Sequence, residues 1–403
     1  MVGEKFIYTL KARRNIVFLI ALGLIILFLG ILICLSNNNI HLIKRIWTNL
    51  WINNVYFVGV SIIGVFFVAL QYVTKSGWSA GIKRIPEAFG YWLPVGFLGM
   101  LFVFLVANNY IFHWTHSYLY DPTHDLYDPI IVGKEPYLNY PFYIFRMFFY
   151  FFVWIFFFRL IRRESLAEDV NGGVVHYKNM VKYSAIFIIF FAVTSSTSAW
   201  DWILSIDTHW FSTMIGWYVF ASSFIAGLSF ITLFVIFLKD EGYLSNVNYE
   251  HFHDLGKFVF AFSVFWTYIW FSQFMLIYYA NIPEETIYYL ERLQSSNYMP
   301  FFFLNLILNF FFPFLGLMAR NTKRYSVFLK IICIILIFGH WLDFYLMITP
   351  GVMAEHGDFG LIEIGIMIVY ASSFVHVILW NLSRVPLVCK QHPLMLESIH
   401  HHT

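Results

Sequence analysis

The sequence predicts an all-α, polytopic membrane protein with about ten transmembrane helices. Of its 403 residues, 60% are hydrophobic and only 12% are charged, whereas about a quarter of the residues of an ordinary soluble domain are charged. A soluble globule of this size cannot keep so much apolar surface away from water. Aromatic residues reach 22%, which is typical of lipid-facing helices and of the Trp and Tyr belts at membrane interfaces.

Apolar stretches of about 20 residues, long enough to cross a hydrocarbon core about 30 Å thick, identify the helices. The predicted spans lie near residues 16–35, 54–74, 90–113, 140–162, 180–203, 212–238, 254–281, 300–319, 325–349 and 361–382. The first span follows a basic run, as the apolar region of a signal peptide does. The apolar region of a signal peptide has about 7–15 residues, and this span is longer. No A-x-A cleavage site follows it, so we expect a retained helix.

The distribution of Lys and Arg predicts the orientation, because basic loops stay in the cytoplasm. The connections after even-numbered spans hold Lys75, Lys83, Arg84, Arg159, Arg162, Arg163, Lys178, Lys182, Lys239, Arg320, Lys323 and Arg324. The odd-numbered connections hold Lys44, Arg45, Lys134 and Arg292, and are otherwise acidic. We therefore expect both termini in the cytoplasm, the loops at 114–139 and 282–299 outside, and one integral membrane domain over residues 1–403.

Composition and spacing argue against several kinds of site. A net charge of +2 gives no support to a nucleic-acid partner. The three cysteines (Cys34, Cys333, Cys389) form neither CxxC nor CxxCH, the patterns of iron–sulfur and c-type haem attachment. His340 and His376 differ by roughly 13 Å in predicted depth, which makes them a poor haem pair. The His- and Asp-rich loop at 113–128 lacks a fixed ligand spacing, so we interpret it as a polar outer loop rather than a metal site. The His400–His402 stretch is expected to end a mobile tail.

A short pattern occurs twice, four spans apart. Span five ends in Ala199-Trp200-Asp201-Trp202 and span six carries Ala221-Ser222-Ser223-Phe224, whereas span nine ends in His340-Trp341-Leu342-Asp343 and span ten carries Ala371-Ser372-Ser373-Phe374. A four-span period preserves the direction of crossing, so the pattern predicts two parallel four-helix repeats. Repeat one covers about 54–203 and repeat two about 212–349, with peripheral helices at about 16–35 and 361–382.

Ionisable groups inside apolar spans are costly and often mark a pathway. Span seven opens with His251, His253, Asp254 and Lys257, and Tyr268 and Ser272 lie on the same helical face as Lys257. The sequence therefore suggests a proton route that enters at His253, Asp254 and Lys257. The alternative is an Asp254–Lys257 pair at the headgroup level with tyrosines in ordinary interface packing.

The outer ends of spans five and nine carry a second set of polar groups. Asp201 follows a run of Ser and Thr, and His340 and Asp343 lie three residues apart. Relay through Tyr268 and Ser272 would lead to these three groups as the exit. The alternative is that the hydroxyls only bond their own helix. Arg146 lies about six residues, roughly 9 Å, inside span four, where it either snorkels outward or pairs with an outer carboxylate.

An ordered series of motifs between about residues 113 and 350 resembles the NrfD-like (polysulfide-reductase-type) membrane subunits of alternative complex III, a bacterial quinol:electron-acceptor oxidoreductase. The motifs are His113-Trp114-x-His116, Asp128-Pro129 with Tyr137-Leu138-Asn139, Asp201-Trp202-Ile203-Leu204-Ser205-Ile206-Asp207-x-His209-Trp210-Phe211-Ser212-Thr213, His253-Asp254-Leu255-Gly256-Lys257, Phe271-Ser272-Gln273, Tyr279-Ala280-Asn281-Ile282-Pro283-Glu284-Glu285-Thr286 and His340-Trp341-x-Asp343.

This resemblance implies two four-helix bundles with flanking helices in the bacterial cytoplasmic membrane. It implies no cofactor in this chain, and as partners a homologous NrfD-like subunit, a periplasmic iron–sulfur subunit, multihaem cytochrome c subunits, small membrane subunits, a terminal oxidase and lipid. Haem c and iron–sulfur clusters are expected in those partners, with quinol as substrate of the complex. The short chain fits the paralogue that lacks the quinol-oxidising site. The competing interpretations are the quinol-binding subunit itself and a secondary transporter with parallel repeats.

Overall fold

The computed structural model describes residues 5–37 and 39–402. Within them the chain is helical without strands, apart from an isolated bridge between Lys5 and Pro386. Among the described residues, ten helices are long and apolar enough to cross a membrane. The predicted fold class, an all-α polytopic membrane protein, is therefore confirmed.

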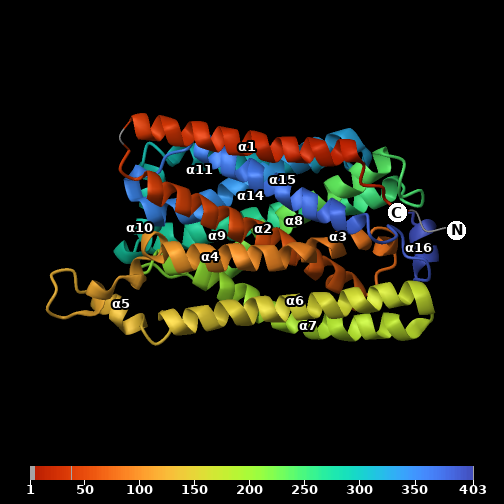
Figure 1. Cartoon of the computed structure of the whole chain (residues 1–403), viewed down its shortest axis with the longest axis horizontal. Helices are drawn as coiled ribbons and strands as arrows, with labels where there is room; N and C mark the ends of the chain where they lie inside the picture. The colour runs from red at the N-terminus through yellow and green to blue at the C-terminus, as the bar shows by residue number, and fades with distance from the viewer. Residues whose placement is uncertain (1–4, 38, 403) are drawn as a thin grey trace.

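The long helices lie side by side along the longest axis of the molecule (Figure 1). They are α1 (Leu10–Ser36), α2 (Leu42–Val73), α3 (Arg84–Phe89) continuing into α4 (Leu93–Ile111), α6 (Tyr140–Asn171), α7 (Val174–Trp202), α8 (Ile215–Asp240), α9 (Tyr249–Ala280), α11 (Met299–Leu306) with α12 (Phe312–Leu317), α14 (Ser326–Met353) and α15 (Leu361–Leu382). The short helices are α5 (Pro129–Lys134), α10 (Pro283–Gln294), α13 (Arg320–Arg324) and α16 (Met395–Ile399). Both chain ends lie at one end of the bundle, here named the terminus end, and α5 and α10 lie at the other, the loop end.

The helices form two groups of four and a peripheral pair. In the first bundle α2 packs against α4 and α7, and α6 packs against α4 and α7. In the second bundle α8, α9, α11–α12 and α14 pack around one another, and α2 contacts α8 and α14 to join the two groups. Helices α1 and α15 pack together at the periphery. The division of the chain into two repeats, and the duplication that would explain it, stay predictions.

The α1–α15 contact is a close approach of two backbones. A Cβ added at Gly365 would lie 2.6 Å from the backbone nitrogen of Leu27, and one added at Gly23 would lie 3.0 Å from the carbonyl oxygen of Gly365. Small residues allow such packing in membranes, where no hydrophobic force draws helices together. Only 17% of the most apolar stretch of α1 is buried inside the protein. The contact with α15 is therefore what holds α1 in place.

Several helices extend beyond their predicted limits because polar residues at their ends are buried by ion pairs. Helix α2 begins at Leu42 rather than near 54, and Arg45, expected in a loop, is buried inside it against Glu363 of α15 at 2.5 Å. Helix α6 continues to Asn171, so the expected loop at 163–179 shrinks to a tight turn. Gly172 and Gly173 make this turn with φ angles of 65° and 79°, which favour glycine.

Candidate functional site

A fully buried carboxylate lies inside the second bundle. Asp343 of α14 is 0% exposed and is ten residues, about 15 Å, from the end of the helix at Met353. Each of the other three helices of the bundle donates one hydrogen bond to it: the Tyr218 hydroxyl from α8, Trp266 Nε1 from α9 at 2.9 Å and Asn305 Nδ2 from α11 at 2.8 Å. All three donors are neutral. Asp343 can therefore bind or release a proton without breaking an ion pair with Lys or Arg.

His340 lies one turn from Asp343 on the same helix and is also fully buried. Its Nδ1 is 3.0 Å from the Ser222 hydroxyl and 4.0 Å from Asp343 Oδ2. Among the described residues, no group bonds its Nε2. A buried polar atom without a partner costs about 1–3 kcal/mol, which bridging water relieves. His340 Nε2 is therefore a buried polar atom that no described group of the chain satisfies.

Helix geometry extends this polar region towards the terminus end. A π-helix at Ile307–Phe311 separates α11 from α12, and such bulges occur frequently at functional sites. Asn309 within it donates from Nδ2 to Asn305 Oδ1 at 2.6 Å, and its own Oδ1 has no partner in the described chain. A Cβ at Gly339 would lie 2.2 Å from this Oδ1, so only glycine leaves room for the amide. Asn305, Asn309, His340 and Asp343 thus form one polar cluster, here the Asp343 cluster.

The first bundle holds its buried carboxylate differently. Arg146 of α6 makes a bidentate ion pair with Asp201 of α7, with Nε–Oδ2 at 2.7 Å and Nη2–Oδ1 at 2.9 Å. The Tyr150 hydroxyl donates a third bond at 2.8 Å, and Arg146 also bonds the carbonyl oxygen of Tyr137. The snorkelling interpretation of Arg146 is therefore wrong. The Arg146 guanidinium can be buried at that depth because its N–H groups donate hydrogen bonds to the Asp201 carboxylate and to the Tyr137 carbonyl oxygen.

Asp201 and Asp343 do not form a shared outer site. Each is bound by its own bundle, and in the described part of the chain no hydrogen bond or ion pair joins the two groups. Glu363, which the sequence places near the same depth, bonds Arg45 and Asn49 of α2 instead. The Ser and Thr side chains at 194–198 bond carbonyls of their own helix, as the alternative interpretation expected.

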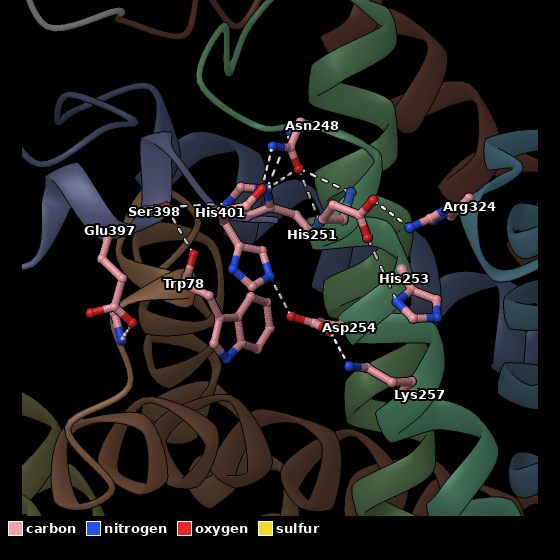
Figure 2. Close-up of polar contacts among 12 residues, drawn as sticks. Trp78, Asn248, His251, His253, Asp254, Lys257, Arg324, Glu397, Ser398 and His401 are labelled. Atoms are coloured by element: carbon pink, nitrogen blue, oxygen red, sulfur yellow. Dashed lines mark hydrogen bonds and ion pairs between the residues drawn. The ribbon is translucent and has the colours of Figure 1, made fainter. Parts of the chain in front are cut away.

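The polar residues at the start of α9 are gathered at the terminus end (Figure 2). Asp254 pairs with Lys257 at 2.5 Å and accepts a hydrogen bond from His401 Nε2 at 2.6 Å. His253 lies 3.8 Å from Glu250, which also pairs with Arg324 of α13 at 2.5 Å. The structure thus contains the Asp254–Lys257 pair of the alternative interpretation, whereas His253 contacts Glu250, and proton entry here stays a prediction. Residues 395–402 pack onto this end through Ser398 and His401, and the mobility expected of the tail stays a prediction.

The predicted relay residues lie on the outside of the second bundle. The Tyr268 side chain is 64% exposed and Ser272 is partly exposed, whereas Ser263, Trp266 and Gln273 of α9 face the interior. The stripe through Tyr268 and Ser272 therefore lies on the outer face of α9, and its role as a relay stays a prediction. Helical spacing finds residues that share a face, but a lipid-facing side is as apolar as a packed one, so spacing does not say which face is buried.

A loop-end group was missed by sequence reasoning. Arg292 of α10 is 2% exposed and donates to the carbonyl oxygens of Leu346 and Met347 of α14. Its guanidinium lies 3.8 Å from Asp207 and 3.9 Å from Glu291. Burial raises the pKa of both carboxyl groups, which Arg292 opposes. These acids line a pocket shared with His113, His209 and Glu284. The sequence does contain one signal for this group, because Arg292 is the single Arg in an otherwise acidic loop.

In the His- and Asp-rich loop, Asp128 caps α5 and pairs with His209 at 2.6 Å. Across the described residues, no group of three or more His, Cys, Asp or Glu side chains is arranged to hold a metal ion. No protein-family model matches the chain, and no curated protein matches it significantly.

Proposed function

We propose that this chain is a cofactor-free membrane subunit of a bacterial respiratory quinol:electron-acceptor oxidoreductase of the alternative complex III type, corresponding to the shorter NrfD-like (ActF-type) subunit. The ordered motif series supports the assignment, and two four-helix bundles with flanking helices are what that resemblance implies. The expected partners are the homologous NrfD-like subunit, the iron–sulfur and multihaem cytochrome subunits, small membrane subunits and a terminal oxidase.

Within that complex, the chain passes protons through its second bundle. One observation carries this proposal: Asp343 is fully buried in a membrane-spanning helix, with neutral donors from three helices and His340 one turn away. Buried carboxylates in membrane proteins that lack a cationic partner are typical of proton relays. Asp201, by contrast, is bound by Arg146, so we assign it to holding α6 against α7.

The route begins at His253, Asp254 and Lys257 and continues along the interior of the bundle. Hydroxyl groups of Ser263 and Ser229 lie on the inner faces of α9 and α8, and bridging waters can connect them to the free Nε2 of His340. From the Asp343 cluster the proton leaves through the Tyr218 hydroxyl towards Asp207 and Glu291. This route replaces Tyr268 and Ser272 with interior groups.

Quinol is oxidised elsewhere in the complex. The reaction needs an electron acceptor near the ring, and we expect that acceptor closest to the paralogous subunit. A photoreactive quinone analogue tests this: labelling of α2, α4, α6 and α7 of this chain, competed away by quinol, would instead identify it as the quinol-binding subunit.

A secondary transporter is the second candidate, because the π-helix interrupts span eight beside Asn305 and Asn309. Transporters with repeats carry paired interruptions in corresponding spans. The corresponding span four is the continuous helix α6, which makes this candidate weaker.

Purification of the full chain from native membranes in mild detergent tests the assignment. We expect multihaem cytochromes and an iron–sulfur subunit to accompany it, and the chain separated from them to be colourless. Recovery of the chain without any haem protein, with substrate uptake in liposomes, would favour the transporter.

A further inference from the structure

The segment after α15, residues 383–402, crosses the terminus end of both bundles. At the first bundle, the backbone nitrogen of Lys390 donates to Asp169 of α6 at 3.0 Å, and the ring of His392 packs against Tyr72 of α2 and Tyr177 of α7. Burial, followed by the nearby Lys83, lowers the pKa of His392 to about 3, so this imidazole is neutral. Cys389, within the segment, is 3% exposed.

Further along, the segment covers the second bundle (Figure 2). The Ser398 hydroxyl is fully buried; it donates to the carbonyl oxygen of Trp78 at 2.8 Å and lies 3.2 Å from His251 Nε2 of α9. His401 bonds Asp254 at 2.6 Å, and Asn248 Nδ2 donates to the His401 carbonyl oxygen at 3.0 Å. With the segment in place, the Asp254 side chain is 8% exposed.

Beyond its buried residues Leu387 and Cys389, the segment is held mainly by polar contacts, which water can replace. Its helix α16 has five residues, far below the length at which a helix is stable on its own. Beyond Cys389 it is attached mainly by polar contacts of Glu397, Ser398 and His401 and by ring contacts of His392 and His401, whereas Leu396 in its centre is 71% exposed. Net contributions of such bonds are about 0.5–1.5 kcal/mol each, so local opening is far easier than unfolding of a bundle.

We propose that residues 383–402 are a movable gate over Asp254 and His251 at the terminus end of the second bundle. In the closed position His401 and Ser398 cover Asp254 and His251. When the segment lifts, Asp254 exchanges His401 for water and becomes accessible for proton entry. The physical opening stands on the geometry alone, and its role in proton entry rests on the proposed function.

Native cysteines report the opening without an introduced probe. The full-length protein in native membranes is treated with a water-soluble maleimide, and mass spectrometry measures the reaction rates of Cys389 and Cys333. Cys333 lies in the core of the second bundle and is 0% exposed, so it is the internal reference. His401→Ala and Ser398→Ala each remove contacts of the closed position, and Leu396→Ala is the control because its side chain points to solvent.

We expect Cys389 to react in the wild-type protein while Cys333 does not. His401→Ala, which removes one side-chain hydrogen bond, should accelerate the reaction of Cys389 roughly five- to tenfold. Ser398→Ala, which removes three hydrogen-bond contacts, should accelerate it at least as much, and Leu396→Ala should not. Equal, negligible reaction of Cys389 and Cys333 in wild type and in both variants would overturn the gate. Faster reaction of Cys389 with an unchanged proton-transfer rate in the assembled complex would leave the gate in place and count against proton entry at Asp254.

Discussion

At the scale of single residues, the two bundles treat a buried carboxylate in opposite ways. Arg146 neutralises Asp201 with a bidentate pair, which fixes the charge and the geometry of α6 and α7. Asp343 receives three neutral donors, so its hydrogen bonds hold the side chain without fixing its protonation state. We therefore expect substitutions at the first site to affect stability and those at the second to affect proton transfer.

Arg146→Met should destabilise the protein by about 3–5 kcal/mol, because it leaves the Asp201 charge buried without a partner. The double variant Arg146→Met/Asp201→Leu should recover much of this loss. Lys330→Met is the matched control: it removes the cation of the exposed Lys330–Asp240 pair and should cost about 0–1 kcal/mol. Thermal unfolding in detergent measures all three, and equal effects of Arg146→Met and Lys330→Met would contradict the account.

Two tyrosines of the second bundle, Tyr218 of α8 and Tyr268 of α9, provide a matched pair. Tyr218→Phe removes a donor to Asp343 and should slow proton transfer through the complex, whereas Tyr268→Phe removes an exposed hydroxyl and should not. Proton release during quinol turnover measures both. If proton release fell only in Tyr268→Phe, the relay would lie on the outer face of α9 instead.

At the scale of elements, the peripheral helix α1 depends on one close contact. A methyl group at Gly365 would lie 2.6 Å from the Leu27 backbone nitrogen, so Gly365→Ala must push α1 away from α15. We expect proteolysis of α1 in detergent to accelerate several-fold. Gly133→Ala, where nothing lies within 4 Å of the added Cβ, is the control and should behave as wild type. Equal protection of α1 in both variants would show that the contact does not hold it.

At the scale of the whole molecule, hydropathy was sufficient for the number and order of the spans, because a helix that crosses hydrocarbon must be long and apolar. It missed Leu42–Asn53 of α2, where Arg45 and Asn49 are buried by Glu363 from the far end of the chain. It also missed Tyr218, Asn305 and Asn309, because a neutral polar residue has no sequence signal that distinguishes a donor to Asp343 from ordinary packing. Asp343 and His340 were found because ionisable residues are rare in such helices.

The orientation of the molecule is a prediction from Lys and Arg. Cysteines introduced at Asp125 and at Lys75 should react with an impermeant maleimide from opposite sides of the membrane, with Asp125→Cys on the outside. Labelling of Asp125→Cys only from the cytoplasmic side would reverse the direction of proton movement in the account.

Proton release per electron by the purified complex in liposomes tests the central claim most directly. Asp343→Asn keeps the shape of the side chain and removes its titratable proton, so we predict that proton release falls at least about tenfold while assembly is unchanged. Asp240→Asn makes the same change at an exposed position of α8 and should leave proton release at the wild-type value. Wild-type proton release by the Asp343→Asn complex would contradict a proton route through the second bundle.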